Sequence, residues 1–265
     1  MNDWTVPHPT WIVGHRGSPR KARENTLESL DVAELAGCEA VEFDIRQARD
    51  GEAVLFHDEE IVLGTQRIPI RTFTSREIEK LQLPSEFGPY RVPRLEDVFH
   101  RYGHALRYVV EVKTSPQTNL SLMARRVSRV AAEFGVRSKC IVASFDAEFL
   151  RKMKDADPEM ATSFLMDHAV ALPESGRLTP LFPPVEAIGP RCDLVSPALV
   201  AHAASARLSV HPWTADEPAE IRRLLSLGVA SITTNVPEVA LAIRAESGDT
   251  ETREHPILER PIPQP

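Results

Sequence analysis

Cysteine is scarce in this sequence, and its spacing excludes two kinds of small, cross-linked protein. The 265 residues contain only three cysteines, and these are far apart, at Cys38, Cys140 and Cys192. An odd, scattered set without a Cys-x-x-Cys pair predicts neither a disulfide framework nor a structural zinc site. A reduced compartment fits this pattern.

Long apolar runs and an excess of positive charge are also missing. No stretch is long enough to cross a bilayer, and residues 1–7 lack the charged and apolar parts of a secretory signal. The 31 Lys and Arg residues face 38 Asp and Glu residues, which gives a net charge of -7. We therefore expect a soluble, cytoplasmic protein without an integral membrane segment and without a nucleic-acid partner.

What the sequence does contain is a long alternation of apolar runs and helical periodicity. We predict a lead-in at 1–10, a barrel domain at 11–245 with an insertion at 59–93, and a polar, proline-rich tail at 246–265 that is disordered or draped over the surface. A short helix is predicted before Gly189. The predicted strands are 11–14, 40–45, 108–112, 140–145, 161–166, 194–196, 208–210 and 231–234. Eight strand–helix units are typical of an α/β protein with a (β/α)8 TIM-barrel fold. An open, doubly wound sheet shares the alternation, but no Gly-rich dinucleotide fingerprint accompanies it.

Two of the predicted strands carry carboxylates at alternate positions. One contains Glu42-x-Asp44 and another ends in Glu111-x-Lys113. Residues two apart on a strand point the same way, so each pair shares a face. A solvated strand face explains either pair alone. Both faces of a parallel barrel strand are normally covered, however, and three converging carboxylates suit one divalent cation, Mg²⁺ or Ca²⁺.

Three of the nine histidines follow predicted apolar runs. His15 precedes Arg16 and Gly17, His57 precedes Asp58, and His211 precedes a Pro-Trp pair. Two imidazoles, a metal ion and an arginine at one barrel mouth would suit phosphoester chemistry, with one imidazole taking a proton and the other donating one. The remaining histidines have no such surroundings; they are His8, His100, His104, His168, His202 and His255.

Taken together, the motifs resemble those of the glycerophosphodiester phosphodiesterases. They occur in the family's order and reach from residue 15 to about residue 240. The matching segments are His15-Arg16-Gly17, Glu24-Asn25-Thr26, Glu42-x-Asp44, Asp50-Gly51, His57-Asp58, Glu111-x-Lys113, Ser144-Phe145, Trp213 and Thr234-Asn235-x-Pro237. Each segment is weak alone, and the ordered set is specific.

The resemblance implies a metal-dependent enzyme that hydrolyses a small glycerophosphodiester to glycerol 3-phosphate and an alcohol. In the family, the neighbouring glycerol hydroxyl is thought to attack phosphorus, and water then opens the cyclic phosphate. The implied roles are as follows: Glu42, Asp44 and Glu111 as metal ligands, His15 as base, His57 as acid, Arg16 and Lys113 on the phosphate, Trp213 on the glycerol carbons, and Glu24 and Asn25 as supporting residues. Plain core packing is the alternative for Trp213.

Some positions depart from the family pattern. Arg23 stands where many members have proline, Ala48 replaces a common threonine, and residues 59–70 lack the usual Arg-Thr-Thr. The alcohol group of the substrate is therefore left open, as is the oligomeric state. Two alternatives are a lipid-facing relative that acts like a phospholipase D or cleaves lysophospholipids, and a catalytically silent barrel that binds phosphorylated polyols. Retention of both histidines and all three carboxylates disfavours the silent barrel.

Overall fold

Eight parallel strands form a nearly closed barrel in the computed structural model, which describes residues 2–5, 8–169 and 182–248. Neighbours around the barrel follow the order β10-β9-β8-β7-β6-β2-β1-β11. The strands are β1 (Trp11–Gly14), β2 (Ala40–Gln47), β6 (Arg107–Val112), β7 (Cys140–Ser144), β8 (Ala161–Met166), β9 (Ala187–Pro190), β10 (Ser209–Val210) and β11 (Ser231–Thr234). Between β10 and β11 the Ala230 N–H donates to the Val210 carbonyl at 2.9 Å, which bridges the seam. The predicted TIM barrel is confirmed.

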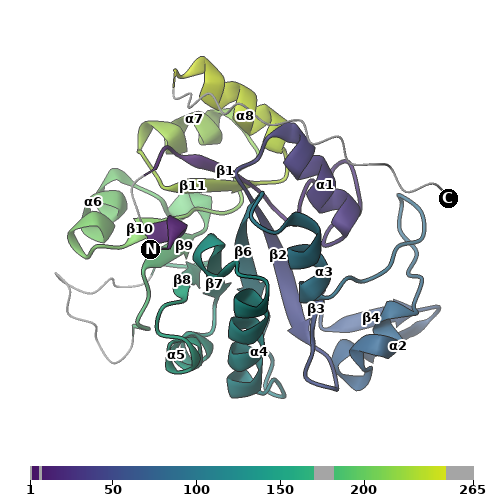
Figure 1. Ribbon diagram of the computed structural model, residues 1–265. Helices are drawn as coiled ribbons and strands as arrows, with labels where there is room; N and C mark the ends of the chain where they lie inside the picture. The colour runs from purple at the N-terminus through teal and green to yellow at the C-terminus, as the bar shows by residue number, and fades with distance from the viewer. Residues whose placement is uncertain (1, 6–7, 170–181, 249–265) are drawn as a thin grey trace.

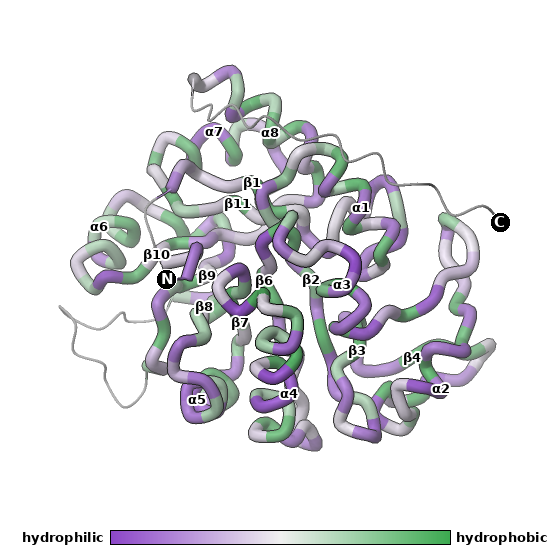
Figure 2. The backbone as a smooth tube through the Cα atoms, viewed as in Figure 1, coloured by the Kyte–Doolittle hydropathy of each residue, from purple (hydrophilic) through white to green (hydrophobic). Residues whose placement is uncertain are grey.

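Helices cover the outside of the barrel (Figure 1). They are α1 (Leu27–Ala36), α3 (Leu95–Tyr102), α4 (Leu120–Glu133), α5 (Ala147–Ala156), α6 (Pro197–Ser205), α7 (Pro218–Ser226) and α8 (Pro237–Glu246). Their starts follow local capping chemistry, as where the Thr26 side chain accepts a hydrogen bond from the Ser29 N–H at the start of α1. Along α4, apolar residues recur at helical spacing and are buried, as at Met123, Val127 and Val130, and Figure 2 shows their alternation with polar residues.

One predicted strand was wrong. Residues 194–196 hold no strand, and the barrel strand is Ala187–Pro190 instead. Gly189 and Pro190 are typical of loops, but in this barrel strand their contacts with neighbouring segments favour both residues. A Cβ at Gly189 would lie 2.5 Å from Leu165, and the Pro190 carbonyl accepts the Trp213 N–H at 3.1 Å. Ser196 instead caps α6. Of the helix predicted before Gly189, residues 182–186 are not helical and the rest lies outside the described residues.

The N-terminal lead-in closes the barrel floor. A short 3-10 helix, η1 (Asp3–Thr5), places Trp4 at 1% exposure against Trp11, the first residue of β1. Trp4 also packs on the residues that begin β2 and β8, Ala40 and Ala161. The floor therefore lies at the opposite end from the carboxyl ends of the strands.

Residues 59–93 form a separate small layer beside the barrel. Strand β3 (Ala53–Leu55) runs antiparallel to β2 and leads into it. The elements that follow are β4 (Glu60–Leu63), β5 (Gln66–Pro69), η2 (Ile70–Thr72) and α2 (Ser75–Glu79). They share a small core that includes Ile61, Ile70 and Ile78, and Figure 1 shows them beyond β3.

No helix among the described residues has both the length and the apolar character needed to span a membrane. Residues 249–265, most of the predicted tail, lie outside the described part of the chain.

Candidate active site

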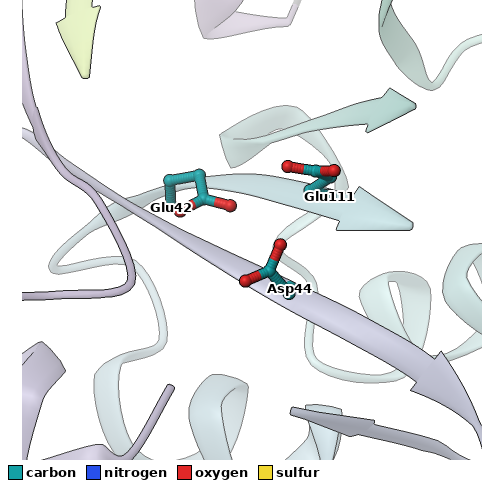
Figure 3. A group of neighbouring side chains, drawn as sticks. All are labelled: Glu42, Asp44 and Glu111. Carbon is teal, nitrogen blue, oxygen red and sulfur yellow. The ribbon is translucent and has the colours of Figure 1, made fainter. Parts of the chain in front are cut away.

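Three carboxylates meet where β2 and β6 lie side by side. Asp44 and Glu111 are direct partners in the register of this strand pair, and Glu42 precedes Asp44 by two residues on the same face. Figure 3 shows the three side chains turned toward a common space. One oxygen from each lies within 4.8 Å of the others. We call Glu42, Asp44 and Glu111 the acidic triad.

The triad is buried and has unused acceptor capacity. Glu42, Asp44 and Glu111 are 4%, 0% and 8% exposed. Glu42 Oε1 has no hydrogen-bond or ion-pair partner, and Asp44 Oδ1 and Glu111 Oε1 contact only the Lys113 ammonium. Buried carboxylate oxygens normally have a partner, because desolvation without one is unfavourable. The triad could therefore hold a hard metal ion.

Burial and mutual repulsion set the protonation of the triad. Burial first, and then the charge of Asp44, raises the pKa of Glu42 to about 8 and that of Glu111 to about 7. Burial also acts to raise the pKa of Asp44, but the charges of Arg16 and Lys113 outweigh it and the pKa is lowered. Asp44 is thus the carboxylate that stays ionised most readily.

Two cations partly balance the three carboxylates. The Arg16 Nε lies 3.0 Å from Asp44 Oδ2, and its Nη1 donates to Glu24 Oε2 at 2.9 Å. Lys113 Nζ lies 3.2 Å from Asp44 Oδ1 and also contacts Glu111 Oε1. These carboxylates outweigh the unfavourable burial of both cations, so the pKa values of Arg16 and Lys113 are raised and both stay charged.

The turn after β1 is shaped to bring backbone and side chain onto the triad. Arg16 adopts a left-handed φ of 53°, and its N–H donates to Glu42 Oε2 at 2.9 Å. Gly17 follows at φ 88°, where a Cβ would lie 2.4 Å from the Ser29 backbone. Glycine is required here for both conformation and space.

Asn25 forms a second strained contact with the triad. Its φ is 56°, its Nδ2 donates to Asp44 Oδ2 at 2.9 Å, and its Oδ1 accepts from the Asp44 N–H at 3.0 Å. Non-glycine residues in the left-handed region are uncommon and concentrate at functional sites. Arg16 and Asn25 both carry this conformation, and both bind triad members.

His15 is held from one side by residues that sequence reasoning did not single out for a role. Its Nδ1 lies 2.7 Å from Asn235 Oδ1, while its Nε2 lies 3.8 Å from Glu42 Oε2. Asp216 fixes the amide of Asn235 by accepting hydrogen bonds from its Nδ2 and its backbone N–H, both at 2.8 Å. With Nδ2 turned to Asp216, the amide oxygen faces His15. Burial, followed by the charge of Arg16, lowers the pKa of His15 and keeps it neutral.

His57 follows β3 and stands at the rim of the site. Its Nδ1 lies 2.8 Å from Asp58 Oδ1, and its carbonyl accepts a hydrogen bond from Arg46 Nε at 2.7 Å. A cleft lined by His57, Glu24 and Asn25 connects it with the turn region. The strand that delivers His57 is antiparallel, so its placement follows from β3 rather than from a barrel strand end.

A cavity extends from the triad into the barrel. Its lining includes His15, Glu42, Glu111 and Trp213. The Trp213 ring packs edge-on against Phe145 at 5.4 Å, and its Nε1 donates to the Gly189 carbonyl at 2.7 Å. Trp213 therefore both packs against its neighbours and faces the site.

Deeper in this cavity lies His211, the third histidine that follows an apolar run. It is hydrogen-bonded to Ser231 and Ser209 at 2.8 Å each. Burial lowers the pKa of His211 to about 3, so it is neutral at physiological pH. Both ring nitrogens of His211 therefore have hydrogen-bond partners, as expected for a buried structural histidine.

The structure thus brings together every residue that sequence reasoning placed at the site. The cluster comprises His15, Arg16, Glu24, Asn25, Glu42, Asp44, Glu111 and Lys113, with His57 and Trp213 lining adjoining cavities. Asp216 was missed because nothing in its local spacing marks it. The Thr-Asn-x-Pro motif pointed to Asn235 without indicating its partner.

Known proteins resemble this chain over the whole barrel. The sequence model of the glycerophosphoryl diester phosphodiesterase family matches residues 15–239. A glycerophosphodiester phosphodiesterase of Bacillus subtilis is 27% identical over 88% of this chain and 86% of its own length. That of Caldanaerobacter subterraneus subsp. tengcongensis is 26% identical over 90% of this chain and 99% of its own.

Solved structures show the same fold. A Silicibacter pomeroyi structure with the provisional name glycerophosphoryl diester phosphodiesterase is 25% identical, with a TM-score of 0.81 over 92% of this chain and 95% of its own. An Oleispira antarctica phosphodiesterase, solved in complex with the product sn-glycerol-3-phosphate, is 20% identical, with a TM-score of 0.76 over 89% of this chain and 97% of its own.

Proposed function

We propose that this chain, which belongs to the glycerophosphoryl diester phosphodiesterase family, hydrolyses glycerophosphodiesters to glycerol 3-phosphate and an alcohol with one divalent cation. The observation that carries the proposal is the acidic triad, in which three buried carboxylates converge, Arg16 and Lys113 balance them only partly, and Glu42 Oε1 has neither a hydrogen-bond nor an ion-pair partner. A phosphodiester carries one negative charge, and positive charge stabilises its transition state. The charged groups of this site are placed to provide that stabilisation.

The donor set of the triad suits Mg²⁺ or Ca²⁺. Glu42, Asp44 and Glu111 supply hard oxygen ligands, and within the described residues no Cys or His joins their group of ligand atoms. With all four carboxylates ionised, the triad and Glu24 against Arg16 and Lys113 leave two net negative charges, which a divalent cation would neutralise. A bound cation would supply Lewis-acid stabilisation of the phosphoryl oxygens.

His15 is assigned as the base. Its Nδ1–H is directed to Asn235 Oδ1, which leaves Nε2 unprotonated on the side of Glu42. Nε2 takes the proton of the neighbouring glycerol hydroxyl as that oxygen forms its bond to phosphorus. The lowered pKa of His15 favours this neutral starting state.

His57 is assigned as the acid. With Nδ1 paired to Asp58 Oδ1 at 2.8 Å, its other nitrogen is available to protonate the departing alkoxide as the phosphorus–oxygen bond breaks. This step yields a cyclic phosphate and the free alcohol. In the second half, water adds to phosphorus with the proton roles reversed, and the ring opens to glycerol 3-phosphate.

The remaining site residues hold the substrate. Arg16 and Lys113 place charged N–H groups beside the triad, where they can bind the phosphoryl oxygens. Trp213 presents its ring to the cavity and can pack on the glycerol carbons. Glu24 and Asn25 keep Arg16 and Asp44 in position through their hydrogen bonds. The cytoplasmic location stays a prediction.

The test is release of glycerol 3-phosphate from glycerophosphocholine, glycerophosphoethanolamine and glycerophosphoglycerol with Mg²⁺, Ca²⁺ or EDTA. We expect metal-dependent release that is lost in His15→Ala and Glu42→Gln and retained in Glu79→Gln, an exposed control. Binding of the diesters without turnover by folded, metal-loaded protein would indicate the silent polyol-binding barrel. Turnover of lysophospholipids alone would indicate the lipid-facing relative.

A further inference from the structure

A second cleft beside the acidic triad carries a surplus of positive charge. It lies between the end of β2, the layer at 59–93 and the loop after β6. Its polar lining includes Arg46, Glu59, Arg71, Lys113, Ser115 and Thr118. Its charged lining thus consists of three cations and one carboxylate, and of the cations Lys113 is already paired with the acidic triad. We call this the basic cleft.

Arg46 is the most unusual of these cations. It follows Asp44 by two residues on β2, so both side chains lie on the same face of the strand. It is half-buried, and burial lowers its pKa against the opposing charges of Glu59 and Asp44. Its Nε donates to the His57 carbonyl. Within the described ranges, neither Arg46 nor Arg71 forms an ion pair with a carboxylate. The nearby carboxylates therefore stabilise Arg46 only from a distance, and a bound anion can pair with its guanidinium directly.

An amide at the base of the cleft points to the same kind of ligand. Gln47 lines the cleft, and its Oε1 accepts from the Asn119 N–H at 2.8 Å, so its Nε2 takes no part in this hydrogen bond. That Nε2 is buried and has no hydrogen-bond partner. The cleft therefore offers a free N–H₂ donor as well as guanidinium donors, and anionic oxygens are the groups that pair with both.

The basic cleft adjoins the acidic triad through Lys113 and is separate from the cavity at His15. Lys113 belongs both to its lining and to the contacts of the triad with Asp44 and Glu111. The cavity that holds His15 and Trp213 also reaches the triad but shares no lining residue with the basic cleft. A diester bound with phosphorus at the triad has two substituents. The cavity with His15 and Trp213 suits the glycerol, and the basic cleft, whose Arg46 contacts the His57 carbonyl, is a place for the alcohol beside the smaller cleft at His57.

We infer that the basic cleft receives the alcohol substituent of the diester and selects alcohols that carry an anionic group, a phosphate or carboxylate. The inference rests on the proposed function. Arg46 and Arg71 pair with the anionic group, and the Gln47 amide donates to it. The cationic choline group faces like charge here and is the disfavoured alcohol. Hydrogen bonds to charged groups correspond to a preference of about 10-fold or more in kcat/KM.

A matched pair of substrates tests this at constant ionic strength. The pair is glycerophosphoinositol and glycerophosphoinositol 4-phosphate, which differ only in the anionic group of the alcohol. We expect the phosphorylated diester to show a kcat/KM about 10-fold higher, with the ratio falling as salt is added. The ratio should fall toward one in Arg71→Gln and in Arg46→Gln. Arg67→Gln, an exposed arginine of the same layer outside the cleft, should keep the wild-type ratio.

The possible outcomes test the inference and the proposed function separately. Hydrolysis of both diesters at equal rates, or a preference that survives both Arg71→Gln and Arg46→Gln, overturns the inference and leaves the proposed function standing. Hydrolysis of neither inositol diester by protein that does hydrolyse glycerophosphocholine also overturns the inference alone. Hydrolysis of no diester with Mg²⁺ or Ca²⁺ by folded protein refutes the proposed function, and the inference falls with it. Because Arg46 also contacts the His57 carbonyl, the ratio between substrates is the readout rather than the rate on either one.

Discussion

Glu42 should make the metal-free protein less stable as the pH rises. Its pKa is about 8 in the folded state, raised from 4.5 first by burial and then by the charge of Asp44. Between these two values the folded state binds more protons than the unfolded state, so the free energy of unfolding falls as the pH increases. The stabilisation is fully present below pH 4.5 and is lost by about pH 8. The size of the pKa change sets an upper limit of about 5 kcal/mol.

Glu42→Gln isolates this effect, because the amide keeps the shape and cannot ionise. We expect the variant to gain about 3 kcal/mol over wild type between pH 5 and pH 8 in EDTA, measured by urea unfolding. Comparing the two proteins cancels titrating groups remote from Glu42, and Glu111, whose pKa the charge of Glu42 helps to raise, contributes in the same direction. Glu79→Gln, at an exposed site on α2, should run parallel to wild type.

Adding Mg²⁺ or Ca²⁺ should narrow the difference in the free energy of unfolding between Glu42→Gln and wild type. Wild type gains about 2.7 kcal/mol at a cation concentration of 100 times Kd, whereas Glu42→Gln, with one ligand fewer, gains less. Parallel pH profiles for wild type and Glu42→Gln in EDTA would refute the account of a buried, repelled carboxylate. Equal cation-induced gains in both proteins would refute Glu42 as a ligand.

Three further substitutions test contacts around the site and at the barrel floor. Asn25→Ala should lower the free energy of unfolding by about 2 kcal/mol in urea titrations, because the Asp44 N–H loses the acceptor that Asn25 provides and alanine tolerates φ 56° poorly; a change within ~0.5 kcal/mol, typical of surface sites, would contradict this. Asn235→Ala should lower kcat by about 10- to 100-fold with KM nearly unchanged, since His15 loses its orientation, and a pure KM effect would argue for substrate contact instead. Trp4→Ala should destabilise the fold by about 3–5 kcal/mol while keeping the cation-induced stabilisation, because Trp4 packs at the end opposite the triad.

The sequence alone was enough for the architecture and for most of the candidate site. Strand and helix patterns depend on neighbours within a few residues, so alternation and capping predicted seven of the eight barrel strands. The exception was Ala187–Pro190. There the close approach of Leu165 to Gly189 and the hydrogen bond from the Trp213 N–H to the Pro190 carbonyl outweigh the local preference of Gly and Pro for loops. The i, i+2 spacing of Glu42 and Asp44 is likewise local, and it is sufficient to place both carboxylates on one face of their strand.

Only the tertiary structure decided which distant groups meet. The register of β2 against β6 sets Asp44 beside Glu111, and Asn235 reaches His15 across 220 residues of sequence. The unpartnered Oε1 of Glu42, the link through Asp216 and the cations that line the basic cleft are likewise properties of the assembled barrel. Local spacing fixes the direction in which a side chain points, whereas distance, burial and charge balance between remote segments arise only when the strands close around a common axis.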